Sequence, residues 1–114
     1  MAASSLRKQL LSALARWQAL LGLEDWRVTL RLRNDPAIYG DIEWRHDRKT
    51  ATLTISPAHD CHEATLVHEL LHLLFARVQD GLDAQQEASM EWGVRKLERT
   101  LAVLANLPYG GEKR

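Results

Sequence analysis

The residues with the clearest chemical potential are His68, Glu69 and His72, which form the pentad His-Glu-Leu-Leu-His. Residues four positions apart lie on one face of a helix, so the two imidazoles can bind one zinc ion together. Glu69 lies beside them, where a carboxylate can take a proton from a zinc-bound water. This spacing is typical of peptide hydrolysis by zinc, in which three protein ligands hold the metal and a fourth position stays open for water.

The pentad lies in a strongly apolar stretch, which predicts a helix packed against the core. Asp60 and Glu63 have the spacing of a capping box, so we expect this helix to begin near Cys61. The polar run at residues 79–81 is predicted to end it. The element that positions the pentad is therefore expected to be a buried helix in the second half of the chain.

A second long helix is predicted after this one, because residues 83–86 offer another capping pattern and apolar residues then recur up to Leu104. A short turn between two helices makes them antiparallel neighbours, and residues equally distant from the turn then face each other. His72 lies nine residues before Gly81 and Glu91 ten residues after it. Glu91 is therefore the expected third zinc ligand, with one zinc ion per chain.

Glu87 is the second choice for the third ligand, because it shares the predicted inward stripe with Met90 and Val94. An unpaired carboxylate would be costly to bury there. Glu87 can also lie one turn away from the metal and hydrogen-bond a ligand histidine or border the substrate cleft. Alternatively, either acid is a solvated helix residue or a partner of Arg95, which follows Glu91 by four positions.

The elements before the pentad are predicted to be one helix and three strands. Apolar residues recur at helical spacing over residues 4–21, and Gly22 is expected to end that helix. Strand-like patterns follow at residues 26–33, 38–46 and 50–56. The last two are separated by residues 47–49, which predicts an antiparallel hairpin. The expected fold is therefore a single α+β domain over residues 1–114 with a three-stranded antiparallel or mixed sheet.

Composition restricts the partners more than it identifies them. The 114-residue chain has fifteen basic and fifteen acidic side chains, so its charge favours neither nucleic acid nor an anionic membrane. Neither a secretory signal nor a membrane span is visible, and a cytoplasmic location follows as the default expectation. Cys61 is the single cysteine, which excludes an intrachain disulfide.

The sequence resembles the gluzincin metallopeptidases, which combine an HExxH helix with a following glutamate helix, and especially their single-domain forms, the minigluzincins. It is also similar to small HExxH proteins encoded by phages and prophages. The residues that carry the resemblance are the pentad and the segment from Glu91 to Leu97, within residues 6–105. The resemblance implies a zincin-like domain in which His68, His72 and Glu91 bind zinc and Glu69 is the general base. It also implies a peptide or unfolded-protein substrate paired with an edge strand, and no cofactor besides zinc.

The sequence departs from the larger gluzincins in the group that stabilises the oxyanion. Those enzymes supply a tyrosine or histidine from a C-terminal subdomain, whereas only residues 107–114 follow the second predicted helix. The possible substitutes are Tyr39, Tyr109, His46, His59 and His62. The alternative function is therefore a catalytically weak or inactive zinc-binding module that acts through a protein partner, which can also complete the cleft. A third hypothesis is a metal-free helical adaptor.

Overall fold

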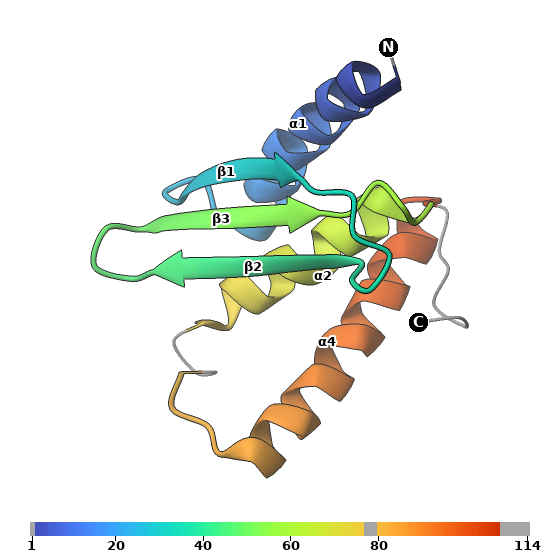
Figure 1. Ribbon diagram of the computed structural model, residues 1–114. Helices are drawn as coiled ribbons and strands as arrows, with labels where there is room; N and C mark the ends of the chain where they lie inside the picture. Colours follow the sequence, from blue (N-terminus) through green and yellow to red (C-terminus); the bar gives the residue numbers. More distant parts are fainter. Residues whose placement is uncertain (1, 77–79, 108–114) are drawn as a thin grey trace.

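The computed structural model describes residues 2–76 and 80–107, and its elements follow one another in the predicted order (Figure 1). They are α1 (Ala2–Leu21), β1 (Arg27–Leu32), β2 (Gly40–Arg45), β3 (Thr50–Ile55), α2 (His62–Leu74) and α4 (Ala84–Leu104). Gly22 follows α1 with a positive φ of 72°, a conformation that glycine adopts without steric cost. The α+β class is therefore confirmed, with helices and strands in separate blocks of the chain.

The three strands form one mixed sheet in the order β1-β3-β2. β1 runs parallel to β3, and β2 runs antiparallel to it, which confirms the predicted hairpin. Leu30, Leu53 and Ile42 are register partners across the three strands, and all three are buried. Because β3 is central, β1 and β2 are both edge strands, and β2 is the edge that contacts α2.

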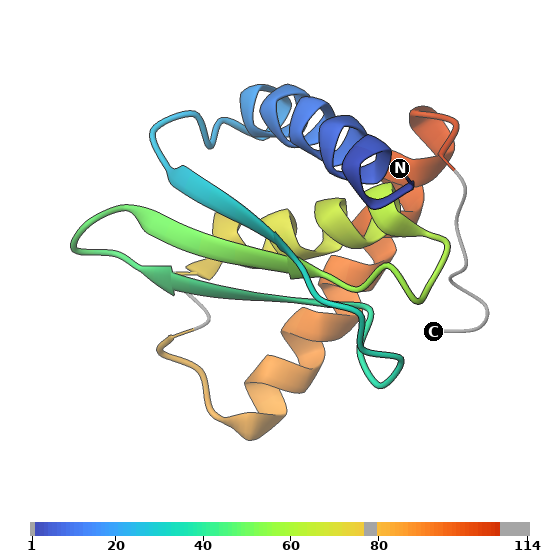
Figure 2. The ribbon, with the colours of Figure 1, turned by 45° about the horizontal axis from the view of Figure 1, so that its top comes forward.

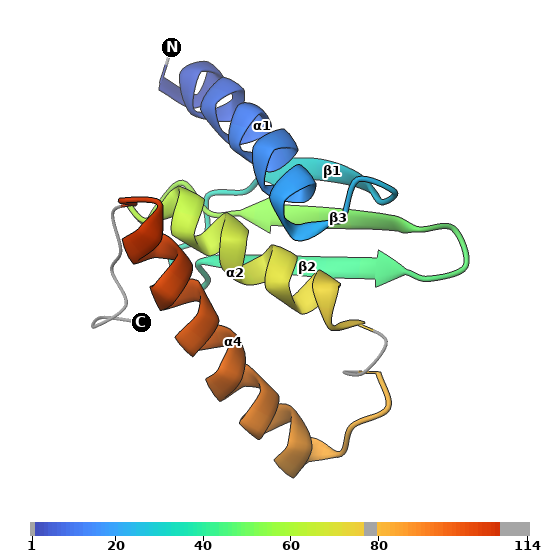
Figure 3. The same ribbon diagram turned by 180° about the vertical axis from the view of Figure 1, so that it is seen from behind.

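The three helices lie on one side of the sheet, as views from the front, from above and from behind show (Figures 1, 2 and 3). α2 contacts β2, β3 and α1, and α4 packs against α2. The core is made largely of aliphatic side chains from these facing surfaces. Leu53, Ile55, Leu66 and Leu70 have no measurable exposure. The helix that carries the pentad is therefore held between the sheet, α1 and α4.

The beginning of α2 was predicted correctly, but the prediction of a capping box at Asp60 and Glu63 was wrong. Cys61 is the N-cap residue, and no side chain caps the helix. Glu63 does not fold back on the helix, because its carboxylate accepts hydrogen bonds from Trp17 Nε1 at 2.8 Å and Arg16 Nη2 at 2.9 Å. This acid therefore joins α2 to α1, and contacts so distant in sequence outweigh the local capping pattern.

The end of α2 also differs from the prediction. The helix ends at Leu74, with Phe75 as its C-cap, rather than at residues 79–81. The backbone N–H of Phe75 donates to the carbonyl of Leu71, which completes the hydrogen bonding of the last helical turn. Gln79, the first residue of the predicted helix end, lies outside the described residues.

α4 begins with the predicted capping box. The Asp83 side chain accepts a hydrogen bond from the Gln86 backbone N–H at 2.8 Å, and the Gln86 side chain accepts one from the Asp83 N–H at 3.1 Å. α4 then runs back in the opposite sense to α2, and the two helices spread apart toward the connecting segment (Figure 3). No helix among the described residues has the length and apolar character needed to cross a membrane.

Candidate metal centre

His68, His72 and Glu91 come together between α2 and α4. Nε2 of His68 lies 3.0 Å from Glu91 Oε1, and Nε2 of His72 lies 2.7 Å from Glu91 Oε2. One ligand atom from each residue lies within 4.8 Å of the others, so the group can hold a metal ion. The structure therefore brings the two pentad histidines to the glutamate that the turn geometry selected.

The local fold explains why these three side chains meet. The histidines are one helical turn apart on α2, and their rings pack edge to face with centroids 5.0 Å apart. Each ring directs Nε2 to a different oxygen of one carboxylate. Two imidazoles and one carboxylate form a donor set that suits zinc, and both histidines already present the same nitrogen. The residues therefore fit a divalent metal.

Charge is concentrated at this cluster. Burial disfavours the charged form of His68, but the hydrogen bonds that its ring donates to Glu91 and Glu98 outweigh burial and raise the pKa of His68 to about 9. The hydrogen bonds from His68 and His72 hold the pKa of Glu91 well below its usual range. The metal-free cluster is therefore an ion pair at neutral pH, and a cation that binds there must displace a proton from His68.

Glu69, the predicted general base, is buried on α2 between the two histidines in sequence and is 8% exposed. Burial raises its pKa, although the positive charges of His68 and His72 act against this. A raised pKa suits a carboxylate that must accept a proton near neutral pH. Glu69 is therefore a buried carboxylate with a raised pKa, next in sequence to the ligand histidine His68.

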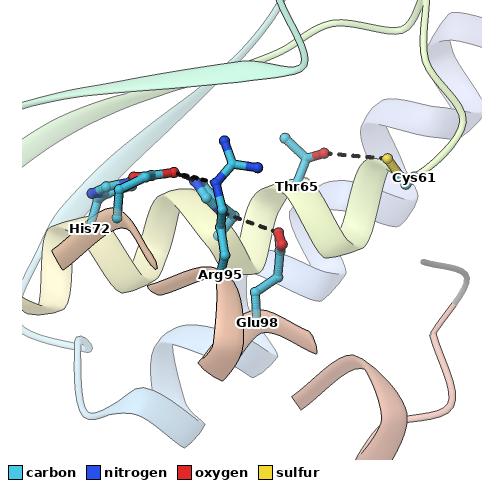
Figure 4. Close-up of polar contacts among 7 residues, drawn as sticks. Cys61, Thr65, His72, Arg95 and Glu98 are labelled. Carbon is cyan, nitrogen blue, oxygen red and sulfur yellow. Dashed lines mark hydrogen bonds and ion pairs between the residues drawn. The ribbon is translucent and has the colours of Figure 1, made fainter. Parts of the chain in front are cut away.

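Glu98 is the residue of this site that sequence reasoning missed. It is 1% exposed, and its Oε1 lies 3.2 Å from Nδ1 of His68 (Figure 4). His68 is thereby engaged through both ring nitrogens, one toward Glu91 and one toward Glu98. A carboxylate on the second nitrogen orients a ligand histidine and fixes its tautomer. The available signal was spacing, because Glu98 follows Glu91 by seven residues and so lies on nearly the same face of α4.

Glu87, the second choice for the third ligand, lies elsewhere. It is exposed in the first turn of α4, where a negative charge is favourable near the positive end of the helix dipole. Of the two acids considered as partners of Arg95, Glu91 makes the contact: its Oε1 accepts a hydrogen bond from Arg95 Nε at 3.1 Å. The structure therefore groups Glu91 and not Glu87 with the histidines.

Three of the residues considered as oxyanion stabilisers make other contacts. The rings of Tyr39 and His59 stack with centroids 3.9 Å apart. His46 Nε2 lies 2.7 Å from a carboxylate oxygen of Asp80. The other two candidates are His62, which is the first residue of α2, and Tyr109, which lies outside the described residues.

Comparison with known proteins identifies no relative of this chain. No protein-family model, curated protein or solved structure matches the chain.

Proposed function

We propose that this chain is a zinc-dependent metallopeptidase of the gluzincin type that hydrolyses peptide bonds. The observation that carries the proposal is the meeting of His68, His72 and Glu91, with one ligand atom from each within 4.8 Å of the others. A histidine pair on one helix and a glutamate on the next is the ligand arrangement that the sequence resemblance implies. Its occurrence in a fold of helix, sheet and two helices supports the zincin-like assignment.

The chain's own residues divide the work as follows. His68, His72 and Glu91 would hold the zinc, and Glu98 would keep the His68 ring in place. When bound, zinc lowers the pKa of a water molecule to about 7 and polarises a carbonyl group. Glu69 accepts the proton of the attacking water and delivers it to the leaving amine, for which its buried position and raised pKa are suitable.

The sheet offers a place for the substrate. β2 is an edge strand, so its outer backbone groups are free to pair with an extended peptide. Gly40 brings the start of β2 so close to α2 that a Cβ there would lie 2.7 Å from Thr65 Cγ2. The peptide-binding edge and the pentad helix are thereby held together. Main-chain pairing favours unfolded or extended polypeptides with little sequence selectivity.

The second candidate function is a zinc-binding module that acts through a protein partner without appreciable proteolysis. An apolar surface on α4 favours it, because Trp92 is 66% exposed and Leu97 is 44% exposed. Next to these side chains is a shallow apolar hollow, lined by Phe75, Met90, Gly93, Val94 and Leu97. Exposed aromatic and aliphatic residues of this kind are common at protein interfaces.

Replacement of the proposed base separates the two functions. Zinc-loaded wild type should cleave an unfolded polypeptide, while Glu69→Gln should keep its zinc and lose about 10²–10⁴-fold in kcat, the usual contribution of a general base. Glu87→Gln is the matched control, since it neutralises an exposed acid in the first turn of α4 and should cleave like wild type. Equal cleavage by wild type and Glu69→Gln would refute the peptidase proposal.

A further inference from the structure

Peptide hydrolysis by this site needs a group that stabilises negative charge on the substrate carbonyl oxygen. We propose that Arg95 is that group. The inference rests on the proposed peptidase function and adds one catalytic residue to it, with an extended peptide as the ligand.

The position of Arg95 is the first argument. Its Nε donates to Glu91 Oε1 at 3.1 Å, so the guanidinium directly adjoins the ligand cluster. The exposed fraction of the side chain rises from 15% in His72 to 33% in Glu91 and 49% in Arg95. The cluster therefore opens to solvent on the side of Arg95, where a substrate must approach.

The orientation of the guanidinium is the second argument. Nε donates to Glu91, while the two terminal nitrogens of Arg95 point away from α4 (Figure 4). Arginine carries five N–H donors in a planar fork, so four remain on the terminal nitrogens when Nε is engaged. The hydrogen bond to Glu91 holds the Arg95 side chain at Nε and leaves the two terminal nitrogens of the guanidinium available to a ligand.

The reaction creates a charge at the place where such a cation is useful. As the water oxygen bonds to the carbonyl carbon, the carbonyl π electrons move to oxygen, and the water proton passes to Glu69. The C–N bond then breaks as the oxyanion collapses to a carbonyl and the amine takes the proton from Glu69. A permanent cation held in position before the reaction stabilises the oxyanion without reorganisation during the step.

The experiment compares Arg95→Gln and Arg95→Lys with Lys96→Gln in the zinc-loaded protein. Lys96 lies on α4 with its ammonium 5.2 Å from the Trp92 ring centroid, so Lys96→Gln removes the same charge without touching the ligand cluster. Four quantities are measured: the zinc Kd, kcat, KM, and the Ki of a phosphinic peptide, whose tetrahedral anionic group imitates the oxyanion.

Arg95→Gln should lower kcat and weaken the phosphinic peptide by a similar factor of about 10²–10³, the usual cost of removing one oxyanion donor. KM and the zinc Kd should change little. Arg95→Lys should recover part of both losses through its charge, and Lys96→Gln should match wild type.

Two results would overturn the proposal. One is wild-type kcat and Ki in Arg95→Gln. The other is a loss of zinc affinity in Arg95→Gln with kcat restored by saturating zinc, which would make Arg95 a positioning residue for Glu91. In both cases cleavage by wild type and its loss in Glu69→Gln would leave the peptidase function standing. If wild type cleaves no polypeptide, the proposed function fails first, and the role of Arg95 fails with it.

Discussion

The charge of His68 should make zinc binding steeply dependent on pH. The hydrogen bonds that His68 donates to Glu91 and Glu98 overcome the effect of burial and raise the pKa of this histidine to about 9. At pH 7 the metal-free protein therefore holds a proton that zinc must displace. As the pH rises from 7 to 9, the unprotonated fraction of His68 rises from about one in a hundred to about one half, so the apparent zinc affinity should rise about 50-fold, or about 2 kcal/mol.

The stability of the metal-free protein should change in the opposite direction. A pKa raised from 6.5 to about 9 stabilises the folded state fully below pH 6.5, and this stabilisation is lost as the pH rises through 9. The loss is about 3 kcal/mol at 1.36 kcal/mol per pKa unit. Glu91 shares the same ion pair, so its lowered pKa describes the same energy and is not added.

Two assays follow these changes. Competition with a chelating dye at pH 7, 8 and 9 should give an affinity that rises about tenfold from pH 7 to pH 8 and about fivefold from pH 8 to pH 9. Urea unfolding of the metal-free protein should show a fall in stability over this range. Glu91→Ala removes the strongest partner of His68, so its metal-free form should lose less stability between pH 7 and pH 9. A zinc affinity independent of pH in wild type, or a metal-free protein that gains stability toward pH 9, would refute the reasoning.

Three further predictions concern the residue beside His68 and the packing of two glycines. Glu98→Gln removes the charge next to His68 Nδ1 and should weaken zinc binding about 10–100-fold at pH 9.5, where proton competition is small. Unchanged affinity by dye competition would show that Glu98 does not orient the ligand. Gly40→Ala places a Cβ 2.9 Å from the Thr54 carbonyl oxygen and should destabilise the fold by about 1–3 kcal/mol. Gly93→Ala meets no atom within 4 Å and should stabilise α4 by about 0.5–1 kcal/mol. Urea unfolding checks the last two predictions, and equal stability of the two variants would contradict the close packing at Gly40.

Local patterns were sufficient to predict most of the fold. Helical and alternating periodicities predicted, in order, the six elements that the described residues form. The capping pattern at Asp83 and Gln86 was correct because both partners belong to one turn. The capping box at Asp60 and Glu63 failed because Glu63 bonds to Trp17, a residue 46 positions away. Contacts of that range depend on how α1 packs on α2, which no local pattern describes.

The candidate site was predictable only as far as the geometry of two consecutive helices. Equal distances from the turn placed Glu91 opposite His72, and the structure puts its carboxylate within 2.7 Å of the His72 ring. Glu98 was missed because a glutamate on a helix is usually solvated, and its burial depends on the way α4 crosses the start of α2. The orientation of Arg95 toward Glu91 was predictable from spacing, whereas its exposure beside the cluster required the structure.

The central claim is a zinc site formed by His68, His72 and Glu91, and metal content tests it most directly. Wild type, Glu91→Ala and Glu87→Ala are purified without a histidine tag, supplied with zinc, desalted and measured by elemental analysis. We predict one zinc per chain in wild type and Glu87→Ala, and strongly reduced zinc in Glu91→Ala. Zinc retained in Glu91→Ala but lost in Glu87→Ala would move the third ligand to Glu87, and absence of zinc from the wild type would contradict the account.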